Sequence, residues 1–263
     1  MNWSVDDIIT TDKYLNLFPS DYYKTDVFYH NQPILWRGNI QNLPSPSAKL
    51  IVSGHSDYPV NDEFASKYPN ARWFSVNTQT SRVRGIPLGV TNNTRESELH
   101  SIYGNTDVMA EIARSPRSIQ NLVYMNFSVH THPTRQAVWE MFKDMSWITV
   151  EHPENSMDGR RRFLQNARNH SFVLCPRGNG VDTHRLWETL YMGSIPIVIR
   201  DIAHSGWTDL PILFVDSWEE VTEERLMQEL HRVETTQWNM KKLLIGYWIT
   251  FIENETGDNS CSN

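Results

Sequence analysis

The strongest constraint on the fold lies in residues 171–198, where two apolar runs flank a helix pattern. The runs 172–175 and 195–199 are apolar at every position, whereas strands with one face in water alternate apolar and polar residues. A helix pattern at 183–192, stopped by Gly193, separates them. Strands buried on both faces and joined by a helix are typical of a parallel sheet with right-handed crossovers.

The same alternation of strand and helix patterns runs through the second half of the chain. It predicts an α/β fold with a parallel sheet. The predicted strands are 122–127, 147–150, 172–175, 195–199 and 212–215, and the predicted helices are 134–143, 158–169, 183–192, 218–232 and 237–253.

The first half is less regular, but it also reads as α/β with long loops. Short apolar runs predict strands at 49–53, 73–76 and 86–90, the last irregular because of Pro87, and a short helix at 62–68. We therefore expect four segments: an α/β domain over 1–115, a second α/β domain over 116–236, a C-terminal helix over 237–255, and a loose tail over 256–263.

Composition and charge narrow the class of protein. With 263 residues and 39% hydrophobic residues, the chain is long and apolar enough for a sizeable core, which excludes disorder and coiled coil. The net charge of −7 makes nucleic acid or an anionic membrane surface an unexpected partner, because both need a basic face. A small anionic ligand needs only a local cluster of arginines.

The cysteines and the N-terminus indicate the compartment. Cys175 and Cys261 form no disulfide framework and cannot hold a structural metal alone. The first residues lack a basic segment followed by an apolar one, and no apolar run approaches the roughly 18–20 residues that span a bilayer. We expect no transmembrane segment and a cytoplasmic location.

The loop 176–182 follows a predicted strand at the edge where parallel sheets bind ligands. Gly178 and Gly180 allow close approach of the backbone and positive φ angles. The N-terminus of the next helix offers free N–H groups to a phosphate, and Arg177 and Arg185 offer guanidinium forks. This pattern predicts an anion-binding loop.

Arg185 and Glu188 are three residues apart, so they share one face of the predicted helix. A glutamate one turn inside that helix can accept hydrogen bonds from ribose hydroxyls. A sugar-binding residue would then lie beside the anion-binding loop. The alternative is a glycine turn followed by a surface ion pair between Arg185 and Glu188.

The run Cys-Pro-Arg-Gly…His-Arg-Leu-Trp-Glu-Thr-Leu…Gly-Ser-Ile-Pro-Ile-Val, within 175–198, resembles the C-terminal signature of exostosin-type glycosyltransferases. It is most similar to exostosin-like glycosyltransferases encoded by large algal viruses, some of which transfer xylose. The resemblance implies the GT-B fold, with two Rossmann-like domains around a cleft, a UDP-sugar donor, and inversion at the anomeric carbon. For a virus-encoded enzyme the cytoplasm would be that of the host.

By that resemblance, Glu188 would hold the ribose, and Arg185 with the loop would hold the diphosphate. The loop after strand 122–127 would face the donor across the cleft, and Asn126, Ser128 and Arg135 could reach an anion there; ordinary loop polarity is the alternative. The donor-binding residues expected in this way are Asn126, Arg135, Arg177, Gly178, Asn179, Gly180, Asp182, Arg185 and Glu188.

Two further patterns have simpler readings. His130 and His132 lack a nearby carboxylate or cysteine, so they do not predict a zinc site. The basic run 160–162 is typical of a solvated helix face, with steering of an anionic donor as the alternative.

Metal-dependent glycosyltransferases of the other common fold hold the metal ion on the diphosphate with an Asp-x-Asp pair. This sequence has no such pair, so we expect no metal and no cofactor. Arginine and helix N–H groups would then neutralise the diphosphate. Inversion also needs a general base opposite the leaving group. Asp57 follows the predicted strand 49–53 and is the favoured base, and His55 is the alternative; Asp62 and Glu63 fall where acidic residues cap a helix.

These patterns together predict a metal-independent inverting glycosyltransferase that moves a sugar, xylose among the candidates, from a UDP-sugar to a hydroxyl of a glycan acceptor. A non-catalytic module that binds a sugar or a nucleotide sugar is the alternative, because a fold alone does not establish function. A phosphate-handling hydrolase ranks last, because the sequence has no Gly-x-Ser-x-Gly elbow and no Walker loop.

Overall fold

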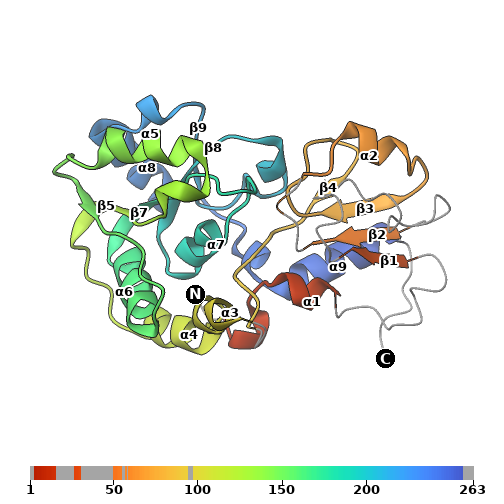
Figure 1. The fold of residues 1–263 in the computed structure, drawn as a ribbon, viewed down its shortest axis with the longest axis horizontal. Coiled ribbons are helices and arrows are strands. Elements are labelled where there is room, and N and C mark those ends of the chain that lie inside the picture. The colour runs from red at the N-terminus through yellow and green to blue at the C-terminus, as the bar shows by residue number, and fades with distance from the viewer. Residues whose placement is uncertain are drawn as a thin grey trace.

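The computed structural model describes residues 3–15, 27–30, 50–54, 57, 59–93 and 97–256. Two parallel sheets form its framework, one in each half of the chain (Figure 1). The first has the order β1-β2-β3-β4 and the second the order β6-β5-β7-β8-β9. The strands are β1 (Val27–His30), β2 (Leu50–Ser53), β3 (Arg72–Ser75), β4 (Arg84–Gly85), β5 (Asn121–Met125), β6 (Ile148–Val150), β7 (His170–Leu174), β8 (Ile195–Ile199) and β9 (Leu213–Val215).

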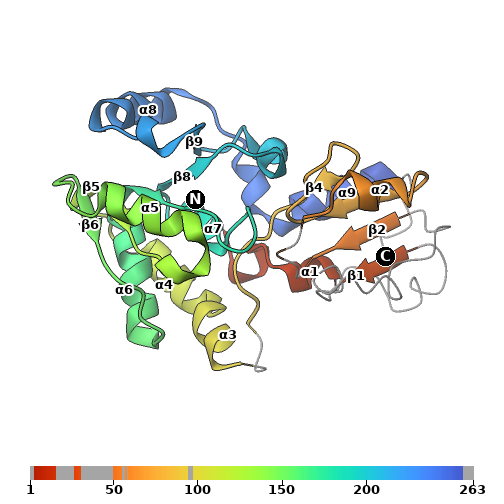
Figure 2. The ribbon, with the colours of Figure 1, turned by 45° about the horizontal axis from the view of Figure 1, so that its top comes forward.

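Helices cover both faces of the second sheet, and Figure 2 shows α6 and α8 on opposite sides of it. Val123 and Met125 pack in one apolar cluster with α5 (Pro133–Phe142) and α8 (Glu223–Thr235). The neighbouring Tyr124 packs in another cluster with α6 (Met157–Arg168) and α7 (His184–Tyr191). The continuous apolar runs therefore reflect burial on both faces, and the predicted α/β class with parallel sheets is confirmed.

Strand order places a topological switch point between β5 and β7, because the chain moves outward to β6 from one and to β8 from the other. In open α/β sheets the crevice beyond the carboxyl ends of such strands is where ligands bind. The segments after β5 and β7 are thus placed to form a site.

Helix α7 ends as the sequence predicts. Gly193 has a left-handed φ of 79°, which a glycine adopts without strain. Its N–H donates to the Leu190 carbonyl at 3.0 Å, and the Ser194 N–H donates to the Thr189 carbonyl at 3.1 Å. These bonds satisfy two carbonyls at the end of the helix and lead the chain directly into β8.

The predicted strand at 86–90 is wrong, since pairing with β3 is made by Arg84–Gly85. Pro87 has no N–H to give to a ladder. The Leu88 N–H donates to the Asp182 carboxylate, and the Val90 N–H donates to the Ile9 carbonyl. The segment is irregular because its donors bind other parts of the chain.

Two predicted helices begin later than the sequence indicates. In place of a helix over 218–232, a 3-10 turn (Trp218–Glu220) is followed by α8, whose N-cap Thr222 accepts from the Arg225 N–H. In place of 237–253, a 3-10 turn (Met240–Leu243) precedes α9 (Ile245–Thr256).

The remaining helices lie in the first half. They are α1 (Thr11–Leu15), α2 (Asp62–Ser66), α3 (Glu98–Tyr103) and α4 (Thr106–Arg114), preceded by a 3-10 turn at Val5–Asp7. The second half has further 3-10 turns at Val129–Thr131 (η5) and Ile202–Trp207 (η6). Helix α4 packs against α6. The division of the chain near residue 115 stays a prediction.

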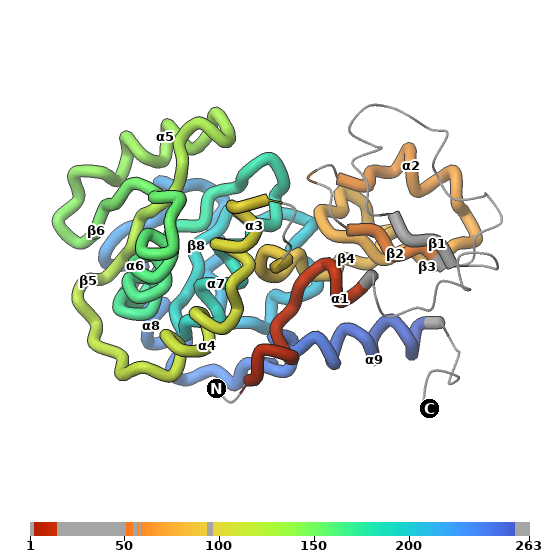
Figure 3. Tube along the Cα trace, turned by 60° about the horizontal axis from the view of Figure 1, so that its bottom comes forward, coloured from red at the N-terminus to blue at the C-terminus, as the bar shows by residue number. Residues whose placement is uncertain are grey.

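Helix α9 connects the two halves, as the tube in Figure 3 shows. Its Phe251 ring meets the Phe74 ring of β3 edge-on, with centroids 5.7 Å apart. The centroid of its Trp248 ring lies 6.1 Å from that of the Trp207 ring of η6. Among the described residues, α9 and the other helices are all too short or too polar to cross a membrane.

Candidate functional site

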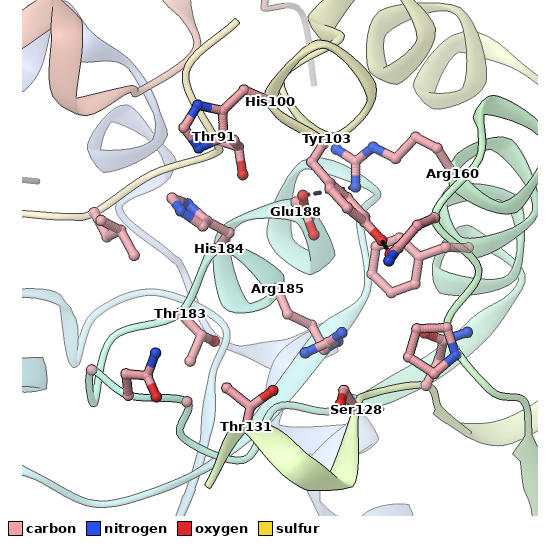
Figure 4. A pocket seen from close by; sticks show the side chains of 18 of the residues that line it. Thr91, His100, Tyr103, Ser128, Thr131, Arg160, Thr183, His184, Arg185 and Glu188 are labelled. Atoms are coloured by element: carbon pink, nitrogen blue, oxygen red, sulfur yellow. Dashed lines mark hydrogen bonds and ion pairs between the residues drawn. The ribbon is translucent and has the colours of Figure 1, made fainter. Parts of the chain in front are cut away.

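A cavity of about 610 Å³ lies beyond the carboxyl ends of β5, β6 and β7. The segments after these three strands form one side, and residues of the first half form the other. Figure 4 shows part of its lining. The lining includes Asp57, Leu88, Thr91, Asn92, His100, Tyr103, Asn126, Ser128, Thr131, Arg135, Arg160, Phe163, Gly178, Asn179, Gly180, Asp182, Thr183, His184, Arg185 and Glu188.

Two arginines hold the loop after β7 in shape. Arg135 donates from Nε to the Arg177 carbonyl at 2.8 Å and from Nη2 to the Pro176 carbonyl at 3.2 Å. Burial lowers the pKa of Arg135 to about 10. The Arg177 side chain turns back and donates to the Asn179 carbonyl at 2.9 Å, and it does not line the cavity. Both guanidinium groups therefore shape the loop.

Gly178 and Gly180 do not have the positive φ that the sequence suggested, because Gly89 and Gly193 are the described glycines with positive φ. Gly180 is needed for close approach: a Cβ there would lie 2.6 Å from Nδ2 of Asn77. Asn77 itself has a φ of 53°, and its Oδ1 accepts from the Asp182 N–H at 2.8 Å. The two halves of the chain thus meet at this loop.

Asp182 is the centre of that junction. Its side chain is buried, and its two oxygens accept from the Leu88 N–H and from Nε1 of Trp187, both at 2.8 Å. Burial raises the pKa of Asp182 to about 7. The residue links the irregular segment 86–90 to the start of α7, so its described contacts are structural.

Arg185 supplies a cation with unused donors. Its Nε is buried and has no hydrogen-bond partner within the described ranges. The guanidinium carbon lies 5.5 Å from the centre of the Phe163 ring. In Figure 4 this side chain points toward Thr131 and Ser128, which follow β5. A buried donor without a partner costs free energy, and an anion in the cavity would satisfy it.

Glu188 is buried and pairs with Arg160, whose Nη1 lies 2.7 Å from Oε1 of Glu188. The surface pair between Arg185 and Glu188 is not formed. The reading of 160–162 as a solvated face is wrong for Arg160, which is fully buried against the rings of Tyr103 and Phe163. The other two arginines of the run are exposed and pair with glutamates.

Asp57 approaches the loop from the first half of the chain. It is exposed to the cavity, and Nδ2 of Asn179 donates to its Oδ2 at 3.4 Å. The alternative base, His55, lies outside the described residues. Of the other expected residues, Asn126 is buried, lines the cavity, and donates to the Tyr124 hydroxyl at 2.9 Å.

Sequence reasoning missed the part of the lining that comes from α3, from 91–92 and from the first residue of α7. His184 donates from Nδ1 to the Gly89 carbonyl at 2.8 Å. Tyr103 of α3 donates its hydroxyl to Asn155 in the loop after β6. His100 and Tyr103 belong to no recognisable motif, whereas His184 is next to Arg185, which was recognised, and could have been found.

In the part of the chain that the structure describes, no three His, Cys, Asp or Glu side chains gather into a metal site.

Curated relatives match part of the chain, although no family profile matches it. The probable β-1,4-xylosyltransferase IRX10L of Arabidopsis thaliana is 34% identical over 91 residues, which are 33% of this chain and 19% of that protein. The probable glucuronosyltransferase Os01g0926400 of Oryza sativa subsp. japonica is 30% identical over 105 residues, 38% of this chain and 22% of that protein. The probable glucuronosyltransferase 47 A of Physcomitrium patens is 33% identical over 91 residues, 33% and 17% of the two chains.

The chain thus spans about a fifth of the length of the curated relatives that it matches. These partial-length relatives are plant xylosyl- and glucuronosyltransferases, and they support the predicted relationship to exostosin-like glycosyltransferases. A closer likeness to viral enzymes stays a prediction.

Proposed function

We propose that this chain is an inverting, metal-independent glycosyltransferase that moves a sugar from a UDP-sugar to a hydroxyl of a glycan. The observation that carries the proposal is the buried, unpartnered Nε of Arg185 in a cavity shared with Glu188 and Asp57. The relatives' names, which include both xylosyl- and glucuronosyltransferases, support the reaction class.

The donor diphosphate lies at the start of α7 in this proposal. Arg185 supplies guanidinium donors, and the first N–H groups of α7 supply backbone donors and the positive end of the helix dipole. These groups stabilise the negative charge of the departing UDP without a metal ion. The loop residues 178–180 line the same cavity.

Glu188 holds the ribose. Its ion pair with Arg160 places a positive charge 2.7 Å from Oε1, although no aligned hydrogen bond joins the two side chains in the described structure. A carboxylate accepts several hydrogen bonds, so the remaining lone pairs can receive the ribose hydroxyls. Arg160 is then a positioning residue that acts through Glu188.

Asp57 is the general base. The acceptor hydroxyl oxygen bonds to the anomeric carbon while the bond from that carbon to the phosphate oxygen breaks, and UDP leaves with the electron pair. Asp57 takes the hydroxyl proton. Its position in the cavity lining, beside Asn179 and within electrostatic range of His184, supports this role.

Release of UDP from UDP-xylose or UDP-glucuronic acid, measured with and without xylo-oligosaccharide or other glycan acceptors, tests the proposal. We expect acceptor-dependent release that persists in excess EDTA. Tight UDP binding without release for any acceptor would instead support the non-catalytic module. An absolute requirement for Mn²⁺ or Mg²⁺ would contradict the metal-independent mechanism.

A further inference from the structure

The first turn of α7 sends two neighbouring side chains into different parts of the cavity. In Figure 4, Arg185 points toward Thr131 and Ser128, and His184 points toward Thr91 and His100. Consecutive helical residues diverge by about 100° around the axis, which explains the divergence. A ligand that extends past the start of α7 can therefore meet both side chains.

The His184 imidazole is fixed as a hydrogen-bond acceptor on its cavity side. Nδ1 lies 2.8 Å from the Gly89 carbonyl oxygen, which can only accept, so Nδ1 carries the proton and Nε2 of the neutral ring carries a lone pair. Burial lowers the pKa of His184, although the hydrogen bond to the Gly89 carbonyl and the negative charges of Glu188 and Asp57 act in the opposite direction. The lowered pKa favours the neutral ring at pH 7.

The Gly89 carbonyl that orients this ring is itself held firmly. Gly89 has a φ of 70°, and a Cβ there would lie within 2.2 Å of the Ile9 carbonyl oxygen, so no other residue fits. The next N–H, that of Val90, donates to the same Ile9 oxygen at 2.9 Å. The tautomer of His184 is therefore set by a rigid backbone group.

A neutral imidazole lone pair discriminates between parts of a nucleotide sugar. Phosphate oxygens are acceptors and cannot donate to Nε2, whereas a sugar hydroxyl can. We propose that Nε2 of His184 accepts a hydrogen bond from a hydroxyl of the transferred sugar. This inference rests on the proposed function, which puts the diphosphate at Arg185 and the ribose at Glu188. His184 is then a specificity-determining residue for the donor.

Substitution of His184 by asparagine or by glutamine tests the two ring nitrogens separately, because the two side chains place their amide groups at different distances from the backbone. Asparagine places its amide nitrogen near the position of Nδ1, so His184→Asn keeps the bond to Gly89 and loses the acceptor. Glutamine reaches the position of Nε2, so His184→Gln restores an acceptor there. His130→Asn, at an exposed histidine outside the cavity lining, is the matched control.

Calorimetric titration with UDP and with UDP-xylose tests the inference, with UDP-glucose and UDP-glucuronic acid in parallel and the tightest-binding sugar nucleotide used for comparison. In His184→Asn we expect UDP affinity within about twofold of wild type and UDP-sugar affinity about five- to tenfold lower, the worth of one hydrogen bond. The affinity of His184→Gln for the UDP-sugar should fall less than that of His184→Asn, and the affinity of His130→Asn should equal that of wild type.

Three results would overturn the inference. His184→Asn could weaken UDP and the UDP-sugar by the same factor, or change neither. It could also leave donor binding intact and raise KM for the acceptor glycan, which would assign the hydroxyl to the acceptor. A wild-type protein that binds no UDP would overturn the proposed function and this inference together. If wild type binds UDP and one of the three results above is found, only the inference fails.

Discussion

Arg160 and Glu188 form a buried ion pair in the wall of the cavity, with Nη1 and Oε1 2.7 Å apart. The two residues come from different helices, α6 and α7, so the pair also joins the segments that follow β6 and β7. Buried charges are retained only when paired, because an isolated charge away from water is costly.

Removing one partner of this pair should destabilise the protein strongly. Arg160→Met leaves the Glu188 carboxylate buried without its counter-charge, and we expect a loss of about 3 kcal/mol in the free energy of unfolding. Urea denaturation followed by tryptophan fluorescence measures it. Arg161→Met is the control, because Arg161 is exposed and its pair with Glu111 should contribute less than about 1 kcal/mol. Equal losses in the two variants would contradict this account.

Gly180→Ala should disturb the junction between the two halves. The new Cβ would lie 2.6 Å from Nδ2 of Asn77, which must move together with its bond to the Asp182 N–H. We expect a loss of about 1–3 kcal/mol. Gly246→Ala in α9 has no atom within 4 Å of the new Cβ and should be neutral or stabilising. Unchanged melting of Gly180→Ala would show that the loop accepts a side chain.

The stability of the fold should depend on pH through Asp182. Its pKa is raised by burial from 3.8 to about 7, so the folded state binds the proton more tightly than the unfolded chain does. This contribution is fully present below about pH 3.8 and is lost as pH rises toward about 7. Because Asp182→Asn does not titrate, the wild-type free energy of unfolding should fall relative to that of the variant between these pH values. Parallel pH curves for the two proteins would contradict the prediction.

Asp57→Asn tests the general base. The amide keeps the shape of the side chain and loses its basicity, so turnover should fall by about 10²-fold or more with UDP affinity nearly unchanged. Glu63→Gln, at an exposed carboxylate of α2, is the control and should retain full turnover. If Asp57→Asn kept more than about a third of wild-type turnover while His55→Ala lost it, the base would be His55.

The second sheet could be predicted from the sequence because its strands are apolar on both faces and its helix boundaries carry local signals such as Gly193. The first half is harder to predict, since the backbone donors of 88 and 90 bind Asp182 and Ile9, which are distant in sequence. Helices α3 and α4 had usable signals, because Ser97 and Asn105 accept from the N–H groups of His100 and Val108.

Part of the cavity lining could be predicted from the sequence because it too is encoded locally. The loop after β7 and the face of α7 are local features, and Arg185 and Glu188 both line the cavity. The burial of Arg160 is not local, because its partner lies 28 positions away on another helix. A run of three arginines gives no indication of which one turns inward.

The most direct test of the central claim is the affinity for UDP of wild type, Arg185→Ala and Glu188→Gln, measured by calorimetry in EDTA. The account predicts that wild type binds UDP and that each variant binds it at least about tenfold more weakly, about 1.4 kcal/mol. The exposed control Arg161→Ala should bind as wild type does. Unchanged UDP affinity in folded Arg185→Ala and Glu188→Gln would contradict the assignment of this cavity to a nucleotide-sugar donor.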